Sequence, residues 1–278
     1  MNKITIFSIL LVLLYTNICA KENTLSPFIG STNYYTSDKD KAYNLGIYFK
    51  SKDIKAVLEN KKTIYSSDSN LSDFSQLSFA AKYDFYNKND LNAYTTINLI
   101  HSSNSEYNGI SSILVGLNKE LRIFTLGTNL SYSHYSNTYV KSVIQVSPYI
   151  GFSFGDYKSL MGNFYTKIIF DSISPDSNVG GIKKDYSTYA LSITHNKNNF
   201  QTLFEYWFKD HIFALHDDGL TIQNYEEVYE NSLSLSVLYK FSYNMSFQLS
   251  YIKKDYRDYD EQSKSKLKNY MMFLYYKF

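Results

Sequence analysis

Apolar and polar residues alternate along most of the chain with the two-residue period of β-strands. In the segment 91–99 the odd positions carry Leu, Ala, Thr, Ile and Leu, and the even positions carry Asn, Tyr, Thr and Asn. The segments 124–132, 200–208 and 233–241 follow the same pattern. Because successive side chains of a strand point to opposite faces, each segment has one apolar, aromatic face and one hydrophilic face. The pattern predicts an all-β protein.

The alternating segments define about fourteen strands. Twelve is an alternative, because the first segment and the segment 53–64 alternate less cleanly than the others. The expected strands are 27–36, 42–51, 53–64, 74–86, 91–102, 110–118, 121–134, 139–154, 158–171, 185–196, 199–211, 229–241, 245–255 and 266–278.

The connections between these strands alternate in length. Short polar turns, such as those near 51–53 and 87–90, are followed by longer polar loops, such as 66–73 and 213–227. Tight turns at one end and long loops at the other are typical of an antiparallel, up-and-down transmembrane β-barrel. A soluble β-sandwich would also alternate, but its apolar face would be a Val, Ile and Leu core.

Composition favours the barrel over the sandwich. Aromatic residues make up 18% of the chain, with 29 Tyr, 11 Gly and 3 Pro. Tyr and Phe recur at the ends of the apolar faces, as in the aromatic girdles at a lipid–water boundary. A formal charge of +2 argues against a nucleic-acid partner. The single Cys19 excludes a disulfide framework and a thiolate metal site.

The first twenty residues have the pattern of a Sec-type signal peptide. Lys3 precedes an apolar run of about a dozen residues, which is too short to span a bilayer as a helix, and Ala20 offers a small residue for cleavage. Cleavage before Cys19, as in a lipoprotein, is an alternative that the bulky Ile18 disfavours. We therefore expect a signal peptide, 1–20, an exported barrel, 21–278, and a location in the bacterial outer membrane.

The last strand carries aromatic residues on one face up to Tyr276 and Phe278. It resembles the terminal strand of bacterial outer-membrane β-barrel proteins, which usually ends in an aromatic residue. The resemblance extends to the architecture of the whole segment 21–278 and implies that the barrel-assembly machinery reads Tyr276 and Phe278. The other expected partners are outer-membrane lipid, lipopolysaccharide and small solutes.

The hydrophilic faces would line a wet interior, because buried ions need partners or water. A barrel of about fourteen strands can hold a water column unless side chains or a loop fill it. Lys outnumbers acid on these faces, which mildly favours anions, although the same charges could pair and close the barrel. The expected pore-lining residues include Lys55, Glu59, Lys82, Lys141, Gln145, Lys167, Asp171, Glu205, Lys209 and Lys240.

Two His-x-Ser-Asn segments could carry hydrolytic chemistry. In each, His and Ser are two residues apart on one face of a strand, close enough for an imidazole to activate the hydroxyl: His101 with Ser103, and His134 with Ser136. Both pairs continue the apolar phase of their strands and would face lipid. The segments are similar to those of outer-membrane phospholipase A and lipid A 3-O-deacylase. That resemblance implies a Ser nucleophile, a His base and calcium as the one cofactor to consider.

The match to these hydrolases is limited to the short segment. Where those families continue with Gly or Ala, this chain has Ser105 and Thr138, and neither His is followed by an evident acid or amide partner. In a chain rich in Ser and Asn, the motif can also arise from composition alone.

No metal-ligand spacing stands out. Acids and histidines at 210–211 and 216–218 could bind a cation, but a solvated loop is the simpler interpretation. The sequence therefore predicts a porin-like channel. A lipid-facing acyl hydrolase and a structural or surface-interaction barrel are the alternatives.

Overall fold

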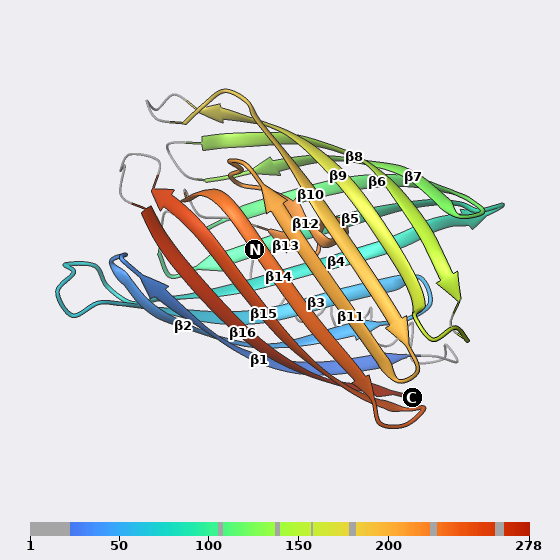
Figure 1. Cartoon of the computed structure of the whole chain (residues 1–278). Coiled ribbons are helices and arrows are strands. Elements are labelled where there is room, and N and C mark those ends of the chain that lie inside the picture. The colour runs from blue at the N-terminus through green and yellow to red at the C-terminus, as the bar shows by residue number, and fades with distance from the viewer. Residues whose placement is uncertain are drawn as a thin grey trace.

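Fourteen antiparallel strands close into a single barrel in the computed structural model (Figure 1). The structure describes residues 23–104, 108–136, 140–156, 158–177, 182–222, 227–258 and 264–278. Among these, no helix is long and apolar enough to cross a membrane. The barrel strands are β1 (Thr24–Tyr35), β2 (Lys39–Lys50), β3 (Ile54–Tyr65), β4 (Phe74–Lys88), β5 (Leu91–Ser102), β6 (Ile110–Leu121), β7 (Phe124–His134), β8 (Val140–Asp156), β9 (Gly162–Ser177), β10 (Tyr186–Lys197), β11 (Phe200–Phe208), β14 (Glu227–Lys240), β15 (Met245–Asp258) and β16 (Lys264–Lys277).

Each strand pairs with its neighbours in the chain, and β1 closes the ring by pairing with β16. Next to this seam the backbones of Asn23 and Phe278 exchange two hydrogen bonds of 3.0 and 2.9 Å. The fourteen predicted strands are confirmed, and the alternative of twelve is wrong. The sandwich is excluded because the sheet closes on itself.

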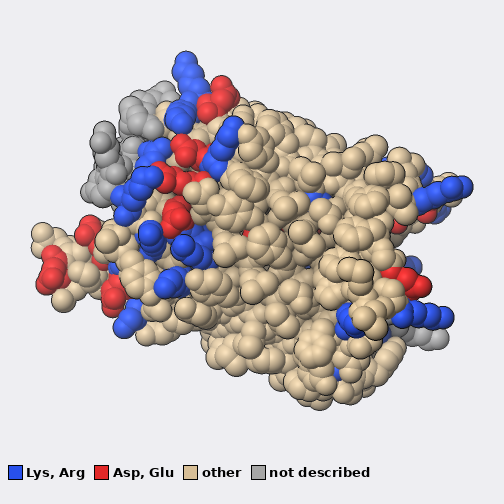
Figure 2. All heavy atoms as spheres, in the orientation of Figure 1, with Lys and Arg blue, Asp and Glu red and all other residues tan. Residues whose placement is uncertain are grey.

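The apolar faces point outward. Along β6 and β7 every second residue is exposed, including Ile113, Val115, Leu130 and Tyr132. Figure 2 shows the consequence: charged side chains gather at the two ends of the barrel, and a broad band of other residues lies between them. Such a band with charged rims is the surface expected of a barrel that sits in a bilayer.

Short turns and long loops occupy opposite ends, as predicted, except that the three-residue connection 36–38 between β1 and β2 lies with the long loops. The turn between β4 and β5 consists of Asn89 and Asp90, both with positive φ (52° and 59°). Two consecutive residues of positive φ are characteristic of the tight hairpin turn whose twist matches that of the strands, and Asn and Asp tolerate this conformation best. We call this end, where Asn23 lies beside Phe278, the turn end and the opposite end the loop end.

Inward-facing tyrosines lie against glycines of the adjacent strand. A Cβ added to Gly116 would lie 2.2 Å from the ring of Tyr94, and one added to Gly127 would lie 2.3 Å from the ring of Tyr149. The missing side chain thus lets each ring lie flat along the inner wall. This packing fixes Tyr94 beside the segment that fills part of the lumen.

Candidate functional site

The connection between β11 and β14 folds into the barrel. We call its described part, residues 209–222, the inner loop. It contains β12 (Leu215–His216), the short 3₁₀ turn η2 (Asp217–Gly219) and β13 (Thr221–Ile222), and the two short strands pair with each other. The loop lies inside the ring of strands in Figure 1. The prediction of a solvated loop here is wrong.

The entry to the inner loop is fixed by backbone pairing. His211 exchanges two backbone hydrogen bonds, both 2.9 Å, with Tyr229 of β14. The flanking residues Lys209 and Phe213 both have positive φ, at 66° and 54°. The chain therefore turns inward at these two points.

An apolar cluster holds the first part of the inner loop. Ile212, Phe213 and Ala214 are at most 1% exposed. The ring of Phe213 lies 4.8 Å from that of Tyr135. This cluster is a small hydrophobic core inside the barrel at its loop end. Its wall is formed by Ile100, Ile110, Tyr135, Val140, Val143, Ile173, Tyr186 and Val228.

Asp218 anchors the tip of the inner loop to the wall. Its carboxylate accepts hydrogen bonds from Lys82 Nζ at 2.8 Å and from the Tyr94 hydroxyl at 3.0 Å. Thr96 Oγ1 donates to the Asp218 backbone oxygen at 2.7 Å. The Lys82 ammonium also lies 3.5 Å from the centroid of the Tyr94 ring. The tip is thus held by a mostly buried ion pair with a cation–π contact.

Amide side chains secure the rest of the inner loop. Asn98 donates to the backbone oxygen of Gly219 at 2.6 Å. Gln145 accepts from the backbone nitrogen of Leu215 at 2.8 Å and donates to its oxygen at 3.1 Å, as a neighbouring strand would. The inner loop is therefore bound to β4, β5 and β8 by specific bonds.

The pKa values of two ionisable groups of the inner loop are both lowered, but for different reasons. Burial alone would raise the pKa of Asp218, but the Lys82 and Lys167 charges and the bonds from Lys82 and Tyr94 hold it below its ordinary value. Burial lowers the pKa of His211 to about 4. Asp218 is therefore charged and His211 neutral at neutral pH, as expected for an ion-paired anchor and a packed ring.

The histidines considered for a cation pack instead against aromatic rings. His216 lies 4.2 Å from Trp207, and His211 lies 5.6 Å from Tyr229, between ring centroids. The described residues contain no group of three or more His, Cys, Asp or Glu that could hold a metal ion.

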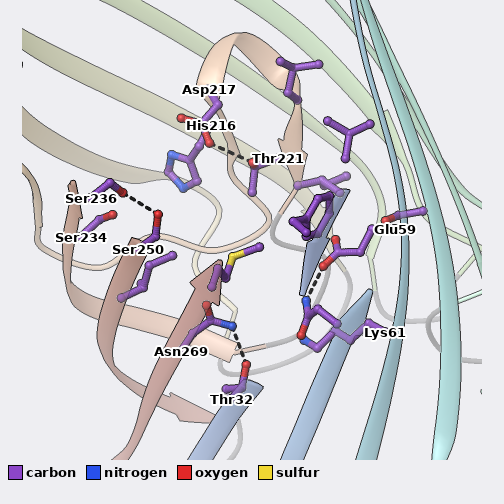
Figure 3. A pocket seen from close by; sticks show the side chains of 18 of the residues that line it. Thr32, Glu59, Lys61, His216, Asp217, Thr221, Ser234, Ser236, Ser250 and Asn269 are labelled. Carbon is purple, nitrogen blue, oxygen red and sulfur yellow. Dashed lines mark hydrogen bonds between the residues drawn. The ribbon is translucent and has the colours of Figure 1, made fainter. Parts of the chain in front are cut away.

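Beside the inner loop, the lumen retains a cavity of about 530 Å³. The inner loop forms one side of it, with His216, Asp217 and Thr221, while β1–β4, Asn98 of β5, β11 and β14–β16 form the rest (Figure 3). Pairs of hydroxyl and amide groups follow its wall, such as Ser236 with Ser250 at 2.8 Å and Asn269 with Thr32 at 2.7 Å. The charged residues that line it are Glu59, Lys61, Glu205, Asp217 and Lys254.

Seven of the ten predicted pore-lining residues form three groups. Lys82, Gln145 and Asp171 are almost completely buried under or beside the inner loop, and Lys82 and Gln145 bind it. Glu59 and Glu205 line the cavity. Lys55 and Lys167 are partly buried, and Lys167 lies 5.1 Å from the centroid of the Tyr149 ring. The cavity has three acids and two Lys, so the predicted excess of Lys over acid is absent among its described residues.

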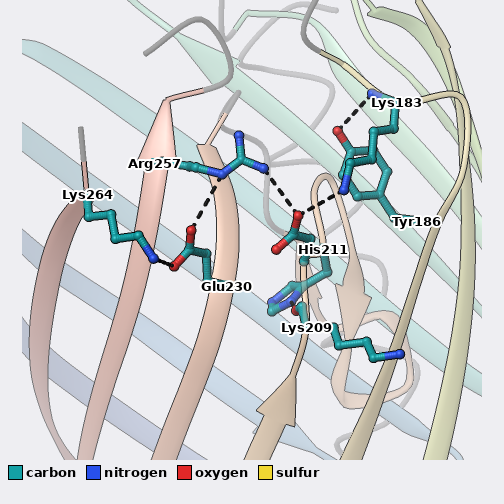
Figure 4. Close-up of polar contacts among 8 residues, drawn as sticks. Lys183, Tyr186, Lys209, His211, Glu230, Arg257 and Lys264 are labelled. Atoms are coloured by element: carbon teal, nitrogen blue, oxygen red, sulfur yellow. Dashed lines mark hydrogen bonds and ion pairs between the residues drawn. The ribbon is translucent and has the colours of Figure 1, made fainter. Parts of the chain in front are cut away.

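Three of the predicted pore-lining lysines lie elsewhere. Lys209 sits 4.6 Å from the centroid of the Tyr189 ring, on the outer face, because the backbone turns at this residue. Figure 4 shows its side chain directed away from the neighbouring ion pairs. Lys141 is exposed at the bulge between Val140 and Ser142, and Lys240 is exposed at the turn end of β14.

An ion-pair network lies above the inner loop at the loop end (Figure 4). Asp210 binds Lys183 at 3.1 Å and Arg257 at 3.2 Å. Glu230 binds Lys264 at 2.8 Å and Arg257 at 3.6 Å. Together the pairs connect β14, β15 and β16 to the entry of the inner loop.

Both His-x-Ser pairs are exposed at the loop end. Ser103 Oγ accepts a hydrogen bond from the backbone nitrogen of Ser75 at 2.9 Å, and Ser136 donates one to the backbone oxygen of Asn108. Within the part of the chain that the structure describes, no hydrogen bond joins His101 to Ser103 or His134 to Ser136.

The hydrolase therefore stays a prediction with a direct test. If it is correct, detergent-solubilised protein hydrolyses phospholipid esters, and Ser103→Ala or Ser136→Ala abolishes that activity. The matched control is Ser75→Ala, a hydroxyl on the neighbouring strand. Hydrolysis that survives both substitutions, or is absent from the unmodified protein, contradicts the prediction.

No protein-family model matches the chain, and no curated protein matches it in sequence. Solved structures do match. The chain is similar to a bacterial polysaccharide outer membrane secretin (TM-score 0.51, 11% identity, 92% of this chain and 98% of that chain). It is also similar to the CymD monoaromatic hydrocarbon channel (TM-score 0.51, 10% identity, 94% and 89%). Omp33 of Acinetobacter baumannii aligns with a TM-score of 0.48 at 6% identity over 93% and 100%. The fold is that of an outer-membrane β-barrel.

Proposed function

We propose that the chain is an outer-membrane channel for small solutes whose lumen is narrowed by the inner loop. The observation that carries the proposal is the polar cavity of about 530 Å³ beside that loop. Its wall of hydroxyl, amide and charged groups suits hydrated solutes, because such groups can replace water molecules as hydrogen-bond partners. The apolar outer band supports a location in a bilayer.

Two further features support this reading. The tip of the inner loop is held by bonds to β4 and β5, so the loop fills part of the lumen and leaves the cavity beside it. The structurally similar CymD is named a monoaromatic hydrocarbon channel, so a barrel of this fold can conduct solutes.

Conductance across a planar bilayer tests the proposal. Purified, folded protein is expected to give discrete current steps, and protein unfolded by boiling in detergent is the control. Exclusion of polyethylene glycols of increasing size then measures the width of the passage. A folded barrel that gives no steps at any voltage would overturn the channel and leave a closed, structural barrel.

We propose the orientation and assembly route on the same basis. The short turns, the start of β1 and the end of β16 lie at one end of the barrel, which in bacterial barrels faces the periplasm. Tyr276 and Phe278 are exposed on the outer face of the last strand, as a signal for the assembly machinery requires. The expected signal peptide lies outside the described residues.

A further inference from the structure

Lysines from three strands form a row on the outer face of the barrel near the loop end. Lys253 of β15 is directly opposite Lys268 of β16. Lys268 is opposite Asn33 of β1, and Asn33 is opposite Lys41 of β2. Residues that are directly opposite each other share a face, about 5 Å apart between Cα atoms. We call Lys41, Lys253 and Lys268, with Asn33 among them, the basic row.

The basic row points outward and borders the apolar band. Each lysine of the row is followed, two positions along its strand toward the turn end and on the same face, by a tyrosine: Tyr43, Tyr251 or Tyr270. The ring centroids of Tyr251 and Tyr270 lie 5.3 Å apart. Tyr43 and Tyr270 are each 49% exposed. Aromatic residues in this position mark the boundary between hydrocarbon and lipid headgroups. The basic row therefore lies at headgroup level.

The lysines of the basic row have few anionic partners in the protein. Lys41 lies 3.9 Å from Asp40, and both side chains are about half exposed. Lys268 lies 5.2 Å from the centroid of the Tyr35 ring. Within the described ranges, no ion pair is formed by Lys253 or Lys268. Because like charges directly opposite each other destabilise a sheet, the pairing of Lys253 with Lys268 is unfavourable unless an anion lies between them.

Neighbouring acids do not neutralise the excess positive charge of the basic row. The acids nearest along the strands are Asp40 and Asp255, and Asp255 is opposite Lys266, an additional outward lysine. Lys264 is bound to Glu230 in the network described above and is not part of the row. Asn33 contributes an amide that can donate to the same anion.

We propose that the basic row binds the phosphate groups of a lipid headgroup in the outer-facing leaflet. The row has the position of a headgroup, the sign of charge that complements phosphate, and the spacing to contact one phosphate with two ammonium groups. The inference rests on the membrane orientation proposed above but not on conduction through the lumen.

The test is binding of phosphorylated lipid A to the detergent-purified protein, measured by native mass spectrometry. The double variant Lys253→Gln/Lys268→Gln is expected to bind it about 30-fold more weakly, as follows from about 1 kcal/mol for each lysine near a phosphate surface. Dephosphorylated lipid A is expected to bind the unmodified protein as weakly as phosphorylated lipid A binds the double variant.

The matched control is Lys119→Gln. Lys119 also faces outward, opposite the exposed Leu126, but lies at the turn end. The Lys119→Gln variant should bind lipid A like the unmodified protein. All variants should retain the gel mobility of the folded barrel and the conductance of the unmodified protein. The proposal is overturned if the double variant binds phosphorylated lipid A as tightly as the unmodified protein does. It is also overturned if the unmodified protein binds dephosphorylated lipid A as tightly as phosphorylated lipid A. Loss of conductance in every sample would reject the channel alone.

Discussion

Asp218→Asn is expected to release the inner loop and widen the channel. The substitution removes the charge that pairs with Lys82 at 2.8 Å and keeps the size of the side chain. Loss of one partner from a buried ion pair costs on the order of 3 kcal/mol, because the other charge stays buried. That corresponds to a decrease of about 100-fold in the equilibrium constant for docking the tip of the inner loop on the wall. Among the described residues, the carboxylate that remains paired with Lys82 is the more distant Asp84, at 3.7 Å.

Single-channel conductance and polymer exclusion measure this effect. The variant should show larger current steps and admit larger polyethylene glycols. Asp217→Asn is the matched control, because Asp217 accepts its 2.8 Å hydrogen bond from Thr221 of the same loop and not from the wall. Gel mobility before and after boiling reports whether the barrel itself remains folded. Steps and exclusion limits identical to those of the unmodified protein would show that Asp218 does not hold the loop.

The strands were predictable because apolar and polar residues alternate along each of them with a period of two. The predicted segment 91–102 coincides with β5, and 185–196 differs from β10 by one residue at each end. The segment 53–64 alternated less cleanly, yet β3 is a regular strand, since its two neighbours satisfy its backbone. Within the regular parts of the strands, alternation also placed the outward and inward faces correctly, because the pattern depends only on adjacent residues.

The inner loop was missed although it left a signal. The run Ile212–Leu215 is apolar within a stretch predicted to be a polar loop, and it is buried in the structure. Ile110 and Val143, on the inward faces at the loop end, are apolar where the prediction expected polar lining. Each signal is weak alone. They become informative only together, because a loop enters a lumen when the wall has an apolar surface to receive it.

Cross-strand partners could not be predicted from the sequence. The contact of Tyr94 with Gly116 and the row formed by Lys253, Lys268 and Lys41 depend on register. Register is set by the exact residue count of every turn and bulge, and a shift of one residue reverses the face. Lys209 shows the same dependence: it continues the inward phase of β11, but a positive φ directs its side chain outward.

Leu130→Arg is expected to destabilise the barrel in a bilayer far more than Leu126→Arg does. Leu130 lies midway along β7, 56% exposed, opposite the exposed Val115 and Val146. An Arg on the lipid face costs about 2–4 kcal/mol at the midplane but only about 0–1 kcal/mol near the interface. Leu126 is on the same face of the same strand, opposite Lys119 near the turn end. It is therefore the matched control for depth.

Urea unfolding in phospholipid vesicles measures both free energies of unfolding. The free energy of unfolding should be much lower for Leu130→Arg than for Leu126→Arg. Hydrocarbon at the centre of the band offers the guanidinium neither water nor phosphate, whereas Arg at position 126 can extend its side chain to the headgroups. If the outer face met water instead, both exposed positions would accept Arg with changes within about 0.5 kcal/mol, as solvent-exposed sites do. Equal, small losses at the two positions would therefore contradict the membrane location and, with it, the channel and the lipid-phosphate site.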